Sequence, residues 1–211
     1  MVSVRNVSVK YSGRHAPALN EISMDIAAGV LTGLSGPSGC GKSTLARCIA
    51  GWQKPNAGAI LRKGEVQLVM QDPGASLNPR FSAWEIVEEP LRIANRGKEA
   101  QKLVGDLLRR VGIAESEAAK TSGRFSGGQR ARLAIARALA AVSGSPGGLV
   151  VLDESLSALD AATRSEILAL LRKLRDDRDM AFLLISHDRE LLAAATESTI
   201  LMKAGRITCS G

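Results

Sequence analysis

The chain has 211 residues, of which 45% are hydrophobic and 23% charged, as in a globular protein with one domain or one domain carrying a small inserted lobe. This composition excludes a disordered or collagen-like chain, and an aromatic content of 3% disfavours single-strand binding by base stacking. The net charge of +7 is spread along the chain without a Lys/Arg tract, which favours a solvated basic surface over a dedicated polyanion patch.

The longest uncharged runs, 26–41 and 138–152, are shorter than the ~20 residues that a membrane-spanning helix needs. The N-terminus carries no basic-then-apolar leader, so we expect a soluble intracellular chain. The three cysteines, Cys40, Cys48 and Cys209, have no paired spacing and indicate neither a disulfide framework nor a zinc site.

Strands and helices alternate in the first third of the chain. Valine alternates with polar residues from Val2 to Lys10, which predicts a strand with one exposed face. A short apolar strand at 31–34 leads through a glycine-rich turn into a helix that begins near Lys42. A further strand is expected at 66–70.

The segment from Asp72 to Arg124 departs from this pattern. It opens with a loop rich in Pro, Gly, Ser and Asn and continues with apolar residues at helical spacing. We therefore predict that residues 72–124 form a helical subdomain inserted within a single domain of residues 1–211.

The alternation of strands and helices resumes after this segment. Helices are expected at 129–141 and 162–175, and buried strands at 149–152 and 181–185, with 197–202 added as a possible edge strand. Buried apolar strands that alternate with helices indicate an α/β fold with a mainly parallel sheet covered on both faces.

The strongest functional pattern lies between the strand at 31–34 and the next helix. It is a phosphate-binding loop, a glycine followed by four residues and then Gly-Lys-Ser, made of Gly36, Pro37, Ser38, Gly39, Cys40, Gly41, Lys42, Ser43 and Thr44. Successive N–H groups in such a loop can point at one anion, and the helix adds its positive dipole end. In this role Lys42 binds the β- and γ-phosphates and Ser43 gives an oxygen ligand to Mg²⁺. The alternative is a glycine turn with an incidental lysine.

Two carboxylates, Asp153 and Glu154, end the buried strand at 149–152. An unpaired charge at such a place is costly, so the pair indicates chemistry, with helix capping as the alternative. Asp153 is the candidate to hold Mg²⁺, and Glu154 is the candidate general base that polarises the attacking water.

A second anion-binding pattern precedes the alanine-rich helix. It consists of a serine and two glycines at a helix start, with the glutamine that follows: Ser126, Gly127, Gly128 and Gln129. Its presence beside a complete phosphate loop suggests that two copies share nucleotides across an interface, unless Ser126 is an ordinary N-cap. His187 follows the strand at 181–185, where parallel sheets bind ligands, and could donate to the γ-phosphate; a plain loop histidine is the alternative.

In their order along nearly the whole chain, these motifs resemble the nucleotide-binding subunit of ABC transporters. The resemblance implies the P-loop NTPase fold of that family, with an N-terminal antiparallel β region, and it implies ATP and Mg²⁺ as cofactors. By resemblance, Tyr11 stacks on adenine, while Gln71 senses Mg²⁺ and water and contacts the transmembrane partner. Ser126 and Gly128 close on the γ-phosphate held by the opposite subunit. Asp160 lies in the loop that crosses between subunits, and His187 is the γ-phosphate switch. The catalytic set is thus Glu154, His187, Gln71 and Lys42.

The stretches 71–79 and 85–91 resemble the branch of importers that takes up oligopeptides, dipeptides and nickel or nickel chelates. This resemblance implies two transmembrane permease subunits, a second ATPase subunit, an indirect link to an extracytoplasmic solute-binding protein and no nucleic acid. The chain would then be peripheral, at the cytoplasmic face of the inner membrane. Two alternatives stay open: a non-transport ABC ATPase acting on nucleic acid or ribosomes, and an ABC-type subunit of phosphonate breakdown.

Three features depart from the family pattern. Phe125 stands where leucine is usual, and Ser155 replaces the usual proline after the glutamate. The chain ends soon after Arg206, without the extension that peptide importers of this branch often carry, which shifts the expectation slightly towards metal or metallophore uptake.

Overall fold

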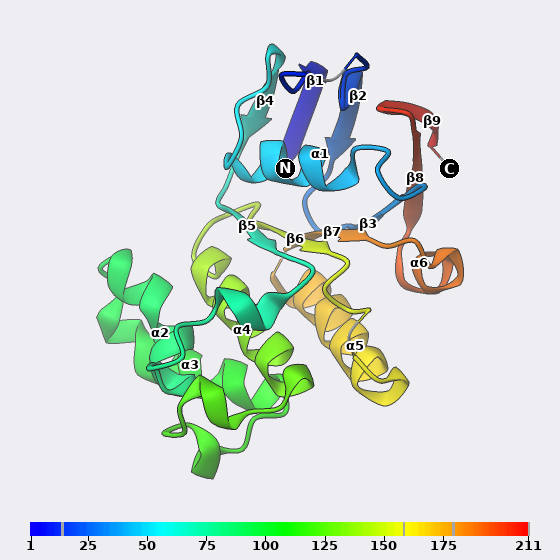
Figure 1. Ribbon diagram of the computed structural model, residues 1–211. Helices are drawn as coiled ribbons and strands as arrows, with labels where there is room; N and C mark the ends of the chain where they lie inside the picture. Colours follow the sequence, from blue (N-terminus) through cyan, green and yellow to red (C-terminus); the bar gives the residue numbers. More distant parts are fainter. Residues whose placement is uncertain (14, 158, 179, 211) are drawn as a thin grey trace.

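The protein is seen in a computed structural model that describes residues 1–13, 15–157, 159–178 and 180–210. Two sheets organise it (Figure 1). The smaller sheet is antiparallel, in the order β2-β1-β4: β2 (Leu19–Ile26), β1 (Val2–Val9) and β4 (Ala57–Arg62). The larger sheet has the order β5-β6-β7-β3-β8-β9: β5 (Val66–Val69), β6 (Leu149–Asp153), β7 (Ala181–Ile185), β3 (Leu31–Ser35), β8 (Ser198–Lys203) and β9 (Arg206–Ser210).

The larger sheet is parallel from β5 to β8, and β9 joins β8 in the antiparallel direction. Helix α1 (Lys42–Ala50) covers the face turned towards the smaller sheet (Figure 1). The other face is covered by α5 (Ala161–Arg178), α6 (Arg189–Ala195) and part of α4 (Gly127–Val142). The predicted mainly parallel sheet with helices on both faces is therefore confirmed. The expected edge position of the strand near 197–202 was wrong, because β9 pairs with β8 and takes the edge.

The spacing of the four valines in β1 reports an irregularity in the strand. Val2, Val4, Val7 and Val9 are all buried, although Val4 and Val7 are three residues apart. The pairing register with β2 shifts between those two residues, and Asn6 has a φ of 50°. This local irregularity lets both halves of the strand bury valine on the same face.

Within the segment 72–124 the chain is helical. It contains η1 (Pro73–Ser76), α2 (Ala83–Ile93), α3 (Gly97–Arg110), η2 (Glu115–Glu117) and η3 (Ser122–Arg124). Helix α4 packs against α2 and also contacts the large sheet, so the limits of an inserted subdomain at 72–124 stay a prediction. Helix α4 begins at Gly127, two residues before the expected start, because Ser126 caps it.

Residues of the central strands alternate between two cores. In β7, Phe182 and Leu184 join the core shared with the helices α2 to α5, while Leu183 and Ile185 face α1 and the smaller sheet. With both faces buried, the ends of the strands are where polar groups can gather. The carboxyl ends of β3, β6 and β7 lie at one edge, where residues after Ser35, Leu152 and Ile185 come together.

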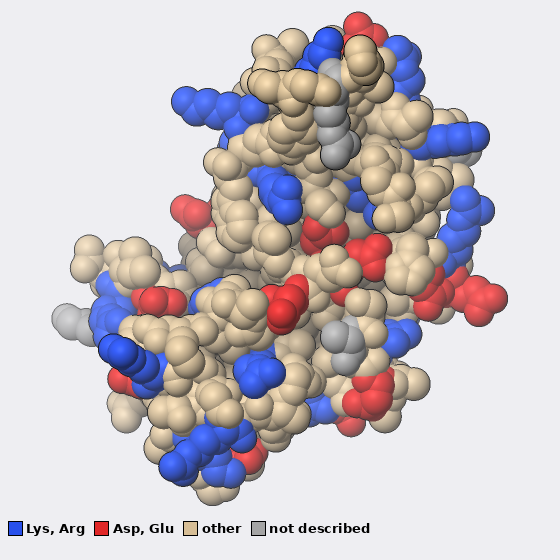
Figure 2. All heavy atoms as spheres, viewed as in Figure 1, with Lys and Arg blue, Asp and Glu red and all other residues tan. Residues whose placement is uncertain are grey.

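The surface charge is scattered. Figure 2 shows Lys and Arg side chains spread over the visible face, with Asp and Glu between them. In the described ranges, no helix has the length and hydropathy of a membrane span.

Candidate functional site

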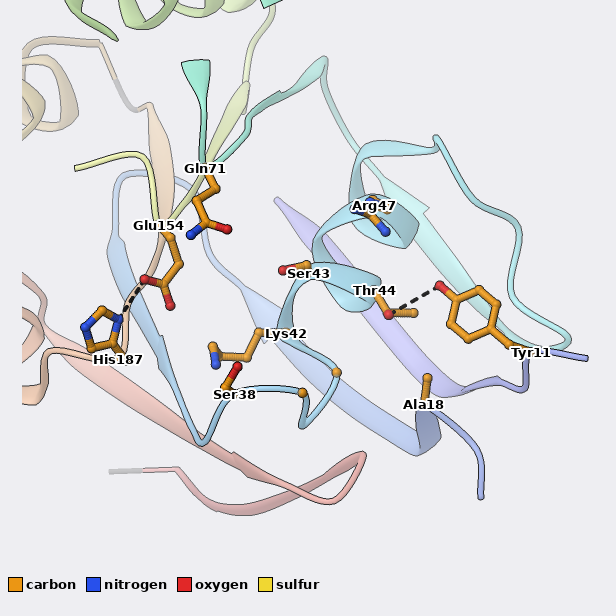
Figure 3. Close-up of a pocket in the computed structure, with 12 residues that line it drawn as sticks. Tyr11, Ala18, Ser38, Lys42, Ser43, Thr44, Arg47, Gln71, Glu154 and His187 are labelled. Atoms are coloured by element: carbon orange, nitrogen blue, oxygen red, sulfur yellow. Dashed lines mark hydrogen bonds and ion pairs between the residues drawn. The ribbon is translucent and has the colours of Figure 1, made fainter. Parts of the chain in front are cut away.

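A cleft of about 640 Å³ opens at the carboxyl edge of the large sheet (Figure 3). Its lining brings together much of the phosphate loop, including Lys42 and Ser43, with Gln71 from the end of β5 and with Glu154 and His187. Segments more than 140 residues apart in the chain thus meet in one site, as expected from the topology of an open parallel sheet.

Glycine is required at two positions of the phosphate loop. Gly41 precedes α1 with a φ of 111°, and a Cβ there would lie 2.3 Å from the carbonyl oxygen of Ala18. Gly39 has a φ of 75°, in the left-handed region that other residues resist. The turn therefore depends on these two glycines, and it leads directly into the N-terminus of α1.

The side chain of Lys42 is folded into the loop. Its Nζ donates to the carbonyl oxygens of Gly36 at 2.7 Å and Pro37 at 3.1 Å, and the residue is 7% exposed. A buried ammonium is costly unless it is paired, and the two carbonyls hold it in place. The loop backbone therefore encloses the Lys42 ammonium.

Asp153, at the end of β6, carries a buried carboxylate whose Oδ1 has no hydrogen-bond partner among the described residues. The residue is 4% exposed. Burial raises the pKa of Asp153, and the charge of Glu154 adds to this, whereas the nearby Ser43 hydroxyl and Lys42 ammonium act in the opposite direction. A carboxylate and a hydroxyl are the oxygen ligands that Mg²⁺ prefers, so Asp153 and Ser43 fit that ion.

Glu154 and His187 form a pair at the inner end of the cleft (Figure 3). Nδ1 of His187 lies 2.7 Å from Oε2 of Glu154, and the imidazole is 70% exposed on its other side. Glu154 has a φ of 52°, uncommon for a residue other than glycine. Its N–H donates to Ile185 and its carbonyl accepts from the N–H and the hydroxyl of Ser157. Backbone strain held by such bonds is typical of a functional residue.

Tyr11 lies at the opposite end of the cleft (Figure 3). Its hydroxyl donates to Gln53 at 2.9 Å and lies 3.4 Å from the hydroxyl of Thr44. These contacts orient the ring, which is half-exposed at the outer wall of the cleft.

The sequence analysis missed two residues of the lining, Ala18 and Arg47. Arg47 follows Ser43 by four residues on α1, so the two lie on one face of the helix, and this spacing could have pointed to it. Ala18 comes from the loop before β2 and carried no signal in the sequence.

The remaining predicted residues do not line the cleft. The N–H of Gln129 donates to the Ser126 hydroxyl, and Oε1 of Gln129 accepts from the Ser126 N–H, so the two form a capping box at the start of α4. Asp160 is exposed and accepts from the Thr163 N–H at 2.9 Å, which lowers the pKa of Asp160. The structure therefore brings the phosphate loop together with Tyr11, Gln71, Glu154 and His187, and leaves Ser126–Gln129 and Asp160 elsewhere on its surface.

Residues 19–157 match the family described as ABC transporter. This chain belongs to the ABC transporter family. The sequence prediction of the family is thereby confirmed.

Curated relatives carry the names of transport and import ATP-binding proteins. The chain is 38% identical to the probable D,D-dipeptide transport ATP-binding protein DdpF of Escherichia coli K12, over 98% of this chain and 70% of that protein. It is 34% identical to the nickel import ATP-binding protein NikE of Escherichia coli strain UTI89, over 93% of this chain and 80% of that protein. Two other relatives named for peptide transport are longer, and the chain spans 58% and 62% of their lengths.

The fold agrees with solved ATP-binding cassettes. One of these is a dimeric cassette in a post-hydrolysis state bound to ADP and Pi; it superposes with a TM-score of 0.87 at 29% identity and covers 100% of this chain and 98% of that chain. The predicted P-loop NTPase fold is therefore confirmed.

Proposed function

We propose that this chain is the ATP-binding and ATP-hydrolysing subunit of an ABC importer, and that it powers the uptake of di- or oligopeptides or of nickel or metal chelates. The chain works at the cytoplasmic face of the inner membrane as a peripheral protein. Relatives that share this chain's full cassette carry import names, which favours this function over an ABC ATPase of nucleic acid, ribosomes or phosphonate breakdown.

The observation that carries the proposal is that three kinds of group lie at one edge of the sheet, two of them lining the cleft and the third buried next to Glu154. A glycine loop with an enclosed lysine, a buried carboxylate whose Oδ1 has no hydrogen-bond partner in the described ranges, and a Glu–His pair lie at the same edge of the sheet. Packing alone gives no reason to bury the Asp153 Oδ1 without a hydrogen-bond partner, because such an atom destabilises the fold. A phosphate chain with its metal ion provides the missing partners.

Each group has one task in the reaction. The loop N–H groups and Lys42 bind the phosphates, and Asp153 with Ser43 would hold Mg²⁺, which would neutralise phosphate charge. Glu154 accepts a hydrogen bond from the attacking water and polarises it, while His187 orients the Glu154 carboxylate and reaches the γ-phosphate. Gln71, which lies beside Glu154 in Figure 3, would contact the water and the metal, and Tyr11 would support the adenine.

A second ATPase subunit completes the site. The exposed N–H groups after Ser126 bind the γ-phosphate held in the phosphate loop of the opposite subunit, and Asp160 lies at the crossing between them. A dimeric cassette with a similar fold supports this arrangement. Two permeases then use the closing and opening of the dimer, and a solute-binding protein delivers the solute.

The test is the steady-state hydrolysis of Mg-ATP by the purified chain and by Glu154→Gln. The variant keeps nucleotide binding, loses about 10²–10⁴-fold in turnover and accumulates as an ATP-bound dimer, because only the polarisation of water is removed. Glu166→Gln is the control; it changes an exposed carboxylate on α5 outside the cleft and keeps the wild-type rate. A Glu154→Gln variant with wild-type turnover would refute the assignment.

A second experiment separates the importer from its alternatives. Affinity purification of the tagged chain from membranes solubilised in detergent should bring down two multi-spanning membrane proteins. Recovery of ribosomal proteins or DNA instead would support a non-transport ATPase.

A further inference from the structure

An arginine outside the cleft joins the two loops that carry the Glu–His pair. Arg164 projects from the first turn of α5, and its Nη2 donates to the carbonyl oxygen of Leu159 at 3.0 Å. Its Nη1 lies 3.9 Å from Oδ2 of Asp188, the residue directly after His187. One guanidinium therefore contacts both the loop that follows Glu154 and the loop that holds His187.

Together these contacts close a ring of residues. It runs from Glu154 along the chain to Leu159, across Arg164 to Asp188, back one residue to His187 and across the 2.7 Å contact to Glu154. The Arg164 side chain lines no part of the cleft and contacts neither Glu154 nor His187 in the described ranges. Its removal opens the ring without changing any group that lines the cleft.

The partial burial of the Arg164 side chain costs folding free energy. It is 28% exposed, and its Nε is buried without a hydrogen-bond partner in the described part of the chain. A guanidinium that only served solubility would lie in water with all its donors solvated. Asp188 is held as well, because its Oδ1 caps α6 through the Leu191 N–H and its own N–H donates to the Ser186 hydroxyl.

The His187 imidazole has few contacts of its own. Its imidazole is 70% exposed, and its one side-chain hydrogen bond in the described ranges is to Glu154. A displacement of the backbone that carries the ring changes the distance of this single contact. The Arg164–Asp188 pair fixes that backbone relative to the loop of Glu154.

We propose that Arg164 is a positioning residue for hydrolysis: it ties Leu159, five residues after Glu154, to the loop of His187 and so keeps the imidazole against the Glu154 carboxylate. The inference rests on the proposed ATPase function, in which the pair orients the attacking water. Because the small misplacement of a catalytic group lowers the rate of the chemical step, Arg164 acts on turnover and not on nucleotide binding.

The kinetic test uses Arg164→Met, which keeps the length of the apolar stem and removes both contacts. We expect kcat to fall about tenfold while the dissociation constant for ATP stays within about twofold of wild type. In the His187→Ala background the same change should alter kcat by less than about twofold, because the ring that Arg164 positions is gone. A loss of equal size in both backgrounds would overturn the inference.

Arg172→Met is the matched control. Arg172 lies on the same helix and donates to the carbonyl oxygen of Ala194 in α6, so it also joins α5 to α6, but it reaches neither loop. It should leave kcat unchanged in both backgrounds. Asp188→Asn, which keeps an oxygen to cap α6, should lower kcat and should add little to Arg164→Met. If Arg164→Met does not fold, Arg164→Gln replaces it, because its shorter, uncharged amide cannot form the ion pair with Asp188.

A spectroscopic readout separates this inference from the proposed function. The chain has two histidines, so the ring signals of His187 can be followed by NMR with exposed His15 as an internal reference. Arg164→Met should move the His187 signals towards those of a free imidazole, and Arg172→Met should not. A wild-type chain without ATP hydrolysis refutes the proposed function, whereas unmoved His187 signals in Arg164→Met refute the positioning role.

Discussion

The two predicted phosphate-binding patterns of this chain, the phosphate loop and the start of α4, differ in whether their polar groups already have hydrogen-bond partners. On the phosphate-loop side, Lys42 is enclosed by backbone carbonyls and Asp153 is buried with an unpartnered oxygen. At the start of α4, the Ser126 hydroxyl is exposed and already satisfied by the capping box with Gln129. The phosphate-loop side thus has a buried polar atom without a hydrogen-bond partner in the described ranges, whereas the start of α4 has the hydrogen bonds of an ordinary capped helix.

The unsatisfied groups confirm this contrast. Four buried side-chain atoms lack hydrogen-bond partners in the described ranges, and three of them belong to Asp153, Ser155 and Arg164. All three lie in one segment, from the end of β6 to the first turn of α5. Unsatisfied buried groups therefore lower the local stability of the segment next to the cleft. The start of α4 at Ser126 has no unsatisfied buried side-chain atom in the described ranges.

Lys42→Ala is expected to have the largest effect, because it removes the cation that the loop encloses. Turnover should fall about 10²–10³-fold, and ATP binding measured by titration calorimetry should weaken in parallel. Lys173→Ala, an exposed lysine on α5, serves as the control and should match wild type. Undiminished ATP binding in Lys42→Ala would mean that the first pattern is not the binding site.

Ser126→Ala should separate the second pattern from the first. ATP binding by the isolated chain should be unchanged, since Ser126 lies outside the cleft, whereas turnover at dimer-forming concentrations should drop about tenfold. Ser82→Ala is the matched control, because Ser82 caps α2 with an equivalent capping box. Both variants should lose about 1 kcal/mol of stability, and only Ser126→Ala should lose turnover. Equal rates in the two variants would leave Ser126 as a cap alone.

The sequence predicted the groups of the site better than their surroundings. The phosphate loop, the two acids and His187 were identified because each has a fixed spacing next to a buried strand. Strand β4 was missed because its residues are exposed or half-buried and show no apolar alternation. The position of β8 was misjudged because the order of strands depends on pairing between distant residues, which no local pattern reports. The contacts of Arg164 with Leu159 and Asp188 could not be predicted for the same reason.

Asp153→Asn tests whether the buried Asp153 carboxylate destabilises the folded chain when no nucleotide is bound. The pKa of Asp153 is raised by burial, so the folded chain binds this proton more readily than the unfolded chain does. The stability of nucleotide-free wild type should therefore fall as pH rises through the pKa of folded Asp153. The uncharged variant should be about 1–3 kcal/mol more stable at neutral pH, with the gain vanishing below about pH 4.

Asp160→Asn is the comparison for this pH series of thermal melts. Asp160 is exposed, and its hydrogen bonds to the start of α5 lower its pKa, so its charge stabilises the fold above the pKa of unfolded aspartate. The variant should thus be less stable than wild type at neutral pH, opposite in sign to Asp153→Asn. A destabilised Asp153→Asn variant at neutral pH would show that the carboxylate is paired in the empty site.

Ser155→Ala should have the smallest effect on stability, and this effect should be an increase. Ser155 is 1% exposed and its Oγ has no partner in the described ranges, so removal of the hydroxyl deletes an unmet hydrogen bond and should stabilise the chain by about 1 kcal/mol. Ser122, 2% exposed, donates to the carbonyl oxygen of Asn78 at 3.0 Å, so Ser122→Ala should destabilise by a similar amount. Urea unfolding of the two variants should move the midpoint in opposite directions. If both variants are destabilised, the Ser155 hydroxyl has a partner in solution, and the contrast between the segment after β6 and the capped start of α4 would then rest on Asp153 and Arg164.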